Sequence, residues 1–146
     1  MSKPSAKAKL EAIMASIIRE VRIDARPEHV WDALRDVSAL HTRLVPGFVV
    51  DTRMDGDARI VTFANGMVAR EEIVDVNDAI RRVAWAIVDG KFLHYNGAAQ
   101  VFPDGISRSR FVWTADLLPN DMAAEVATMI EAGLPVIKRT METQAG

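Results

Sequence analysis

The side chains that most often carry out acid–base or metal chemistry are scarce in this sequence. Histidine occurs at three positions, His29, His41 and His94, and cysteine is absent. No two of these histidines stand four residues apart, as the histidines of a helical zinc pair do. We therefore expect no metal site, no disulfide and no cysteine nucleophile. Glycine-rich phosphate loops and G-x-S-x-G motifs are also missing, and we expect no cofactor.

The orientation of His94 decides whether a histidine is available as a general base. His94, Tyr95 and Asn96 follow one another in a segment with the pattern of a strand. Strict alternation counted back from Val101 turns Tyr95 inward and His94 outward. A β-bulge would reverse this, and His94 could then serve as a general base inside the protein. Both orientations stay open at this stage.

Arg59 and Glu71 form a candidate polar pair. Arg59 shares the parity of Phe63, so we expect it to point inward. Glu71 shares the parity of Ile73, although the valines of the same segment have the opposite parity and leave its inward face ambiguous. A buried arginine needs a partner, and a carboxylate is the usual one. The pair is then either a structural ion pair, which we favour, or a polar anchor for a ligand.

The elements that would position these residues follow from turn signals and periodicity. Asp55-Gly56 and Asn65-Gly66 are strong hairpin turns, and the apolar spacing after Pro119 indicates a long helix. We expect strands at 16–24, 48–54, 58–63, 68–76, 83–88, 92–102 and 106–118, short helices from 27 and over 38–44, and a long helix over 120–143. Residues 1–14 are expected to form a tail or short helix, and 15–146 a single domain.

Composition limits the classes of function. The 146 residues are 49% hydrophobic and 26% charged, which is ordinary for a folded protein. A formal net charge of −2 argues against a nucleic-acid-binding protein. No apolar run reaches the ~18 residues that span a bilayer, and no signal peptide is evident. We expect a cytoplasmic monomer or homodimer without membrane or nucleic-acid partners.

This order of elements resembles the helix-grip fold. The residues that carry the resemblance are Ala25-Arg26-Pro27-Glu28-His29-Val30-Trp31-Asp32, Arg59, Arg70-Glu71, and Phe111-Val112-Trp113 before Leu118-Pro119. Over residues 16–142 the sequence is similar to the SRPBCC superfamily, which includes START domains and birch-pollen-allergen-like proteins, and most similar to its polyketide cyclase/dehydratase-like branch. The resemblance implies an α+β fold in which a curved antiparallel sheet wraps the long C-terminal helix. It also implies an apolar cavity between the two.

Small residues and aromatic side chains both occur on the elements that would enclose such a cavity. Gly97, Ala99, Ala115 and Gly133 are expected to leave space, and Trp31, Trp85 and Trp113 to be mostly buried. The candidate ligand-binding residues are Arg59, Glu71, Trp85, His94, Tyr95, Phe111, Trp113 and Met129. The alternative is that the aromatic side chains simply pack a filled core.

Two functions of different class remain. The first is binding of a small apolar or aromatic molecule in the cavity, to which the resemblance adds cyclase or dehydratase-type activity. The second is a non-enzymatic protein-interaction module with a filled core, acting through its surface. No catalytic residue is assigned, because cyclase or dehydratase chemistry needs an acid–base pair aimed into the pocket and no pair of that kind stands out.

Overall fold

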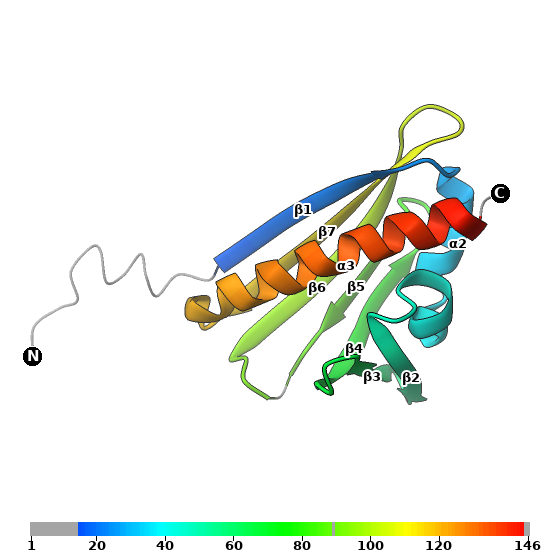
Figure 1. The fold of residues 1–146 in the computed structure, drawn as a ribbon. Coiled ribbons are helices and arrows are strands. Elements are labelled where there is room, and N and C mark those ends of the chain that lie inside the picture. Colours follow the sequence, from blue (N-terminus) through cyan, green and yellow to red (C-terminus); the bar gives the residue numbers. More distant parts are fainter. Residues whose placement is uncertain (1–14, 89, 145–146) are drawn as a thin grey trace, which may run out of the picture.

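A computed structural model of the protein describes residues 15–88 and 90–144, so the expected tail over 1–14 lies outside the described residues. Seven strands form one antiparallel sheet in the order β1-β7-β6-β5-β4-β3-β2 (Figure 1). Their bounds are β1 Ala15–Ile23, β2 Val49–Asp55, β3 Ala58–Phe63, β4 Val68–Asn77, β5 Arg82–Ala86, β6 His94–Pro103 and β7 Ser109–Leu118. The predicted strands are thus all present, with ends that differ by up to three residues. The predicted class, an α+β helix-grip fold, is confirmed.

Tight glycine turns set the order of the meander. Gly56 joins β2 to β3 and Gly66 lies between β3 and β4, with φ angles of 61° and 89°. Side chains other than glycine, asparagine or aspartate rarely adopt this left-handed conformation, which explains the Asp-Gly and Asn-Gly signals. These turns keep consecutive strands paired, so the sheet is a meander from β2 to β7, and β1 completes it by pairing with β7.

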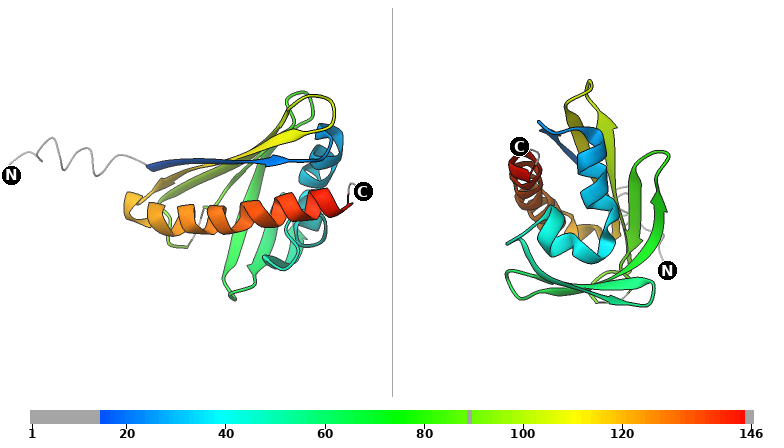
Figure 2. Two further views of the ribbon diagram at one scale, coloured as in Figure 1. Left: turned by 45° about the horizontal axis from the view of Figure 1, so that its top comes forward. Right: turned by 90° about the vertical axis from the view of Figure 1, so that its right-hand side faces the viewer.

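The C-terminal helix α3 (Ala123–Gln144) crosses the concave face of the sheet, with β1 beside it (Figures 1 and 2). Its buried stripe includes Val126, Ile130, Ile137 and Met141, spaced by four, seven and four residues. A turn of 3₁₀ helix, η3 (Asn120–Met122), leads into α3, and the helix continues through Pro135.

Short helical segments between β1 and β2 cover one end of the concave face. They are α2 (Pro27–Arg35), a 3₁₀ turn η1 (Val37–Ala39) and one turn of π-helix, η2 (Leu40–Leu44). The helix expected over 38–44 is therefore replaced by two irregular turns. The indole nitrogen of Trp31 donates a hydrogen bond to Asp78 Oδ1 at 2.9 Å, which ties α2 to the β4–β5 turn.

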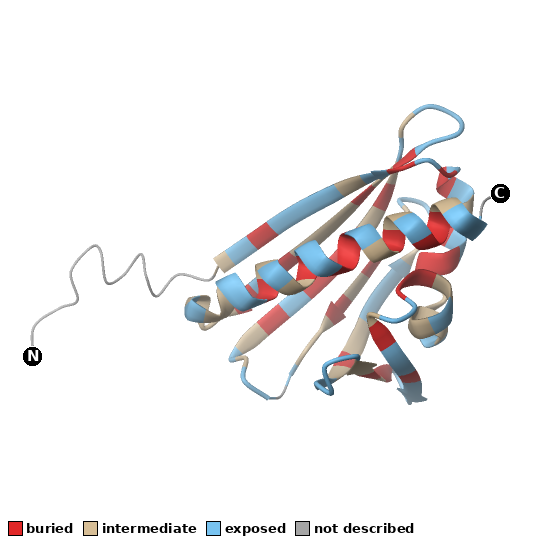
Figure 3. Ribbon diagram, viewed as in Figure 1, coloured by how far each residue is buried: buried red, intermediate tan, exposed pale blue. Residues whose placement is uncertain are grey.

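Buried side chains lie on the faces that the sheet and α3 turn toward each other (Figure 3). Trp31 and Trp85 are 7% and 6% exposed, as expected for core residues. Trp113 is more exposed than the other two tryptophans, but most of its side chain is still buried and packs against the core, as expected. Its ring faces the hollow between the sheet and α3 that forms the candidate site.

Candidate functional site

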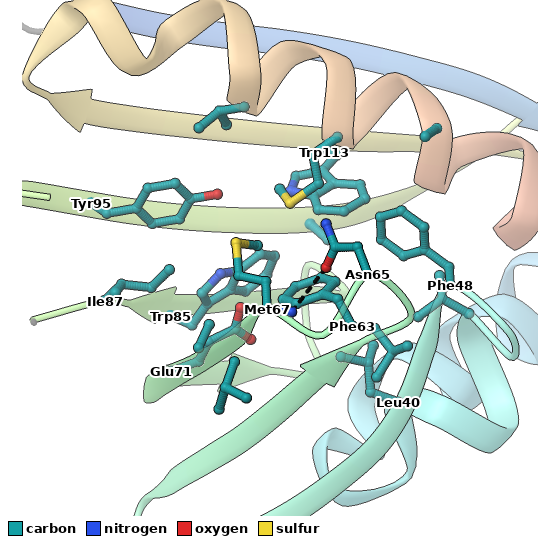
Figure 4. A pocket seen from close by; sticks show the side chains of 18 of the residues that line it. Leu40, Phe48, Phe63, Asn65, Met67, Glu71, Trp85, Ile87, Tyr95 and Trp113 are labelled. Carbon is teal, nitrogen blue, oxygen red and sulfur yellow. Dashed lines mark hydrogen bonds between the residues drawn. The ribbon is translucent and has the colours of Figure 1, made fainter. Parts of the chain in front are cut away.

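A cavity of about 590 Å³ lies between the concave face of the sheet and α3 (Figure 4). Its wall is mostly apolar and aromatic, with a few polar groups. The apolar and aromatic lining includes Leu40, Leu44, Phe48, Phe63, Met67, Trp85, Ile87, Tyr95, Phe111, Trp113 and Met129. A volume of this size is typical of sites for small organic molecules.

The cavity is open to solvent where three segments meet. They are the β3–β4 turn, the β5–β6 loop and the first turns of α3, which contribute the exposed lining residues Met67, Lys91 and Glu125. Met67 and its neighbour Val68 are 46% and 58% exposed. The opening is thus rimmed by apolar side chains as well as charged ones, and an apolar molecule would meet a compatible surface on its way in.

The Arg59–Glu71 pair is the main charged feature of the interior. Arg59 is on β3 and Glu71 is opposite it on β4, and the two are 4% and 7% exposed. Arg59 Nε donates to Glu71 Oε1 at 2.8 Å, and Arg59 Nη1 donates to the Val37 carbonyl at 3.3 Å. The guanidinium carbon also lies 5.4 Å from the centre of the Trp85 ring, within range of a cation–π contact. The structure thus turns both charges inward and pairs them at the cavity wall.

Tyr95 projects from β6 into the cavity and is 3% exposed. Burial raises the pKa of its hydroxyl, and the nearby Glu71 carboxylate raises it further. The hydroxyl therefore stays protonated across the physiological range and is available as a hydrogen-bond donor. The Phe92 ring lies 4.8 Å from the Tyr95 ring and holds it from the side of the β5–β6 loop.

Gly97 and Gly133 do not leave open space as the sequence suggested. A Cβ atom at Gly97 would lie 2.4 Å from Cε2 of Trp85, and one at Gly133 would lie 2.9 Å from Cζ3 of Trp113. Each glycine therefore accommodates an indole ring that packs directly on the backbone. The two rings meet edge to face, with centroids 6.5 Å apart, and form one continuous wall.

Neither His94 nor the other two histidines line the cavity. His94 is half-buried on the opposite face of β6, where its Nε2 lies 3.2 Å from Nδ2 of Asn96. The alternation of β6 is not interrupted by a bulge, since its pairing with β5 and β7 runs without a register shift. The structure therefore places His94 outside the cavity, apart from the other candidate ligand-binding residues. The other candidates, Arg59, Glu71, Trp85, Tyr95, Phe111, Trp113 and Met129, all lie on the cavity wall.

Sequence analysis missed the part of the wall that comes from η2, β2, β3 and the turn after β3. Phe48 and Phe63 meet there at 5.7 Å with ring planes 86° apart, and Leu40 and Met67 extend the same surface. The parity of Phe63 with Arg59 was a usable signal. Leu40 and Phe48 carried none, because their orientation depends on irregular turns rather than on a periodic element.

The sequence matches the protein family described as "Polyketide cyclase / dehydrase and lipid transport" over residues 14–142. The chain therefore belongs to this family, within the SRPBCC superfamily. A search by sequence among curated proteins gave no match.

Solved structures with the same fold include proteins of different activity. The protein XoxI from Bacillus cereus superposes with a TM-score of 0.76 at 20% identity, covering 88% of this chain and 96% of that one. Norcoclaurine synthase from Thalictrum flavum, solved with dopamine and hydroxybenzaldehyde, gives 0.68 at 14% identity, with 99% and 93% covered. The di-domain ARO/CYC protein BexL, from the BE-7585A biosynthetic pathway, gives 0.76 at 16% identity, with 88% of this chain and 47% of BexL covered. At these identities the likeness shows a shared fold.

Two further observations concern residues 15–88 and 90–144. No helix in these segments is long and apolar enough to cross a membrane. They contain no group of three or more histidine, aspartate or glutamate side chains that could hold a metal ion.

Proposed function

We propose that this protein binds a small apolar or aromatic molecule in the cavity between the sheet and α3. The observation that carries the proposal is the cavity itself, which holds about 590 Å³ behind a rim of apolar and charged side chains and is lined mainly by aromatic and aliphatic side chains. Burial of apolar ligand surface against such a wall would supply most of the binding free energy. The enclosed polar groups would then orient the ligand.

The presence of this cavity favours ligand binding over the alternative of an interaction module with a filled core. A chain under selection only for a stable core gains nothing from open volume, because unfilled space forfeits packing contacts. Membership of a family that includes cyclases adds cyclase or dehydratase-type conversion of the ligand as an extension of the same proposal. That extension needs a group that moves protons, and Glu71 and Tyr95 are the ionisable side chains that lie together on the inner wall.

Native mass spectrometry of freshly purified protein tests the proposal. We expect a retained molecule that increases the mass and is released on denaturation. The Ala99→Phe variant should lose it, because Ala99 lines the cavity and a phenyl ring there would occupy the ligand's space. Ala124→Phe adds the same atoms on the exposed side of α3 and should retain it.

A direct titration complements the search for a retained molecule. We expect wild type and Ala124→Phe to bind 2-isopropenylnaphthalene in a calorimetric titration, and Ala99→Phe to bind it at least about tenfold more weakly. Equal binding by folded Ala99→Phe, or no binding by any of the three proteins, would contradict the proposal.

A further inference from the structure

The polar atoms of the cavity wall divide into those with a partner inside the protein and those without one. Arg59 and Glu71 pair with each other, and two groups toward the rim are also engaged: Asn65 Oδ1 accepts from the Met67 amide and Thr128 Oγ1 donates to the Ala124 carbonyl. Within the described residues, three groups on the enclosed part of the wall have no hydrogen-bond partner: the buried indole nitrogens of Trp85 and Trp113, and the Tyr95 hydroxyl. Lys91 and Glu125, which also lack one, are exposed at the rim.

The three unpartnered groups have one chemical property in common, since each is a hydrogen-bond donor. An indole N–H can only donate, and a protonated phenol donates its single O–H. A buried donor that leaves water and finds no acceptor destabilises the protein, and native structures contain few such groups. Two such buried indole donors, together with the unpartnered Tyr95 hydroxyl on the same apolar wall, indicate that the missing acceptor comes from the molecule that fills the cavity.

The geometry separates Trp85 from the other two donors. The Trp85 nitrogen lies 2.5 Å from the point that a Cβ atom at Gly97 would occupy, so it is held against the backbone of β6. Trp113 instead rests on Gly133 through Cζ3 and Cη2, at the far edge of its six-membered ring. Figure 4 shows the Tyr95 hydroxyl pointing along the cavity toward Trp113, whose nitrogen is on the side of the ring that faces Tyr95.

We infer that Tyr95 and Trp113 select ligands that carry a hydrogen-bond-accepting oxygen, such as an aryl ketone, and that both donate to that oxygen. This inference rests on the proposed function and adds a chemical class to it. A purely hydrocarbon ligand of the same shape fills the cavity but leaves both donors without an acceptor. An amine is a poor match as well, because an ammonium group brings only further donors to this part of the wall.

A pair of probes of nearly equal shape tests the inference. In 2-acetylnaphthalene a carbonyl oxygen takes the place of the terminal CH₂ of 2-isopropenylnaphthalene. The measured quantity is the ratio of their dissociation constants, obtained by calorimetric titration of each protein. Each probe loses the same hydration whichever protein binds it, so a change of this ratio between wild type and a variant isolates the contact inside the cavity.

Three variants apply this test. Tyr95→Phe removes one hydroxyl that has no hydrogen-bond partner among the described residues, and Trp113→Phe removes the indole N–H. In each we expect the preference for the ketone to fall about fivefold relative to wild type. Trp85→Phe is the matched control: it removes an indole N–H whose nitrogen lies against the backbone at Gly97, so both probes should weaken alike and the ratio should stay as in wild type.

The outcomes distinguish this inference from the proposed function. If wild type binds both probes and the ratio is unchanged in Tyr95→Phe and Trp113→Phe, the donors do not contact the ligand and the inference is overturned, while ligand binding in the cavity stands. If neither probe binds wild type, the proposed function is contradicted and the inference falls with it. The carbonyl stretch of bound 2-acetylnaphthalene gives an independent readout, since it should shift to higher frequency in Tyr95→Phe.

Discussion

Replacing Glu71 with glutamine removes the charge that opposes the buried Arg59 guanidinium. Arg59 is 4% exposed, its Nε donates to Glu71 at 2.8 Å, and its one other hydrogen bond within the described residues goes to the Val37 carbonyl. Breaking a buried ion pair by removing one partner costs about 3–5 kcal/mol, because an uncompensated charge is left behind. We expect Glu71→Gln to lower the free energy of unfolding by this amount.

The assay is equilibrium unfolding in urea, with Asp55→Asn as the matched control. Asp55 accepts from Arg70 at 2.6 Å, but both side chains are exposed to solvent by a third or more. Loss of such a surface pair should cost far less, because solvent screens the two charges. The two variants each remove one carboxylate charge from an arginine on the same part of the sheet. They differ in burial, and Arg70 also keeps a second carboxylate partner, Glu72, at 3.2 Å.

A loss below about 1 kcal/mol for Glu71→Gln would refute this reasoning, since it would mean that water in the cavity solvates the pair. If such a variant also bound its ligand more weakly, the pair would be a ligand anchor and not a structural element. The double variant Arg59→Met with Glu71→Leu tests the same reasoning by removing both charges of the pair. It should recover most of the lost stability, because it leaves no charge buried.

Three other changes test the packing of the wall and the attachment of α3. Trp113→Ala should lower the free energy of unfolding in urea by less than the ~3 kcal/mol expected for a core tryptophan, since the ring is half-buried and already faces open volume. A loss of about 3–5 kcal/mol would instead assign the ring to the core. Gly97→Ala should destabilise by about 1–3 kcal/mol and shift tryptophan emission, because its Cβ would meet the Trp85 ring; unchanged stability and emission would show that the ring moves freely. Glu142→Gln should cost at most about 1 kcal/mol near neutral pH. Hydrogen bonds from Lys138 and the Asp24 amide lower the pKa of the Glu142 carboxyl, so its contribution is complete above the unfolded-state pKa and is lost as pH falls. The difference from wild type in urea unfolding should therefore vanish in strong acid, and a constant difference at all pH values would contradict this assignment.

Most of the fold was predictable because it is encoded locally. The Asp-Gly and Asn-Gly turns mark where each hairpin reverses, and the spacing of Val126, Ile130 and Ile137 marks the face of α3 that packs on the sheet. For wall residues on regular strands, the inward orientation was predictable from the parity of their positions. Tyr95 is the clearest example, because the register of β6 runs without a bulge and the alternation counted from Val101 holds along its length.

The features that could not be predicted depend on contacts between different elements, and a local sequence pattern does not contain those contacts. The inward direction of Glu71 was ambiguous because β4 has a register shift between Ile73 and Asp75, which changes the parity of the strand after that point. Gly97 and Gly133 were expected to leave open space, whereas each packs directly against an indole ring from another element. In both cases the deciding information is the position of a partner strand or helix.

The most direct test of the central claim, that the hollow between the sheet and α3 is a ligand site, is a crystal structure of the protein with 2-acetylnaphthalene. We expect density for the naphthalene rings between Phe111, Trp113 and Met129, with the ketone oxygen within hydrogen-bonding distance of the Tyr95 hydroxyl. A cavity closed by side chains, or a probe bound only on the outer surface, would contradict the account.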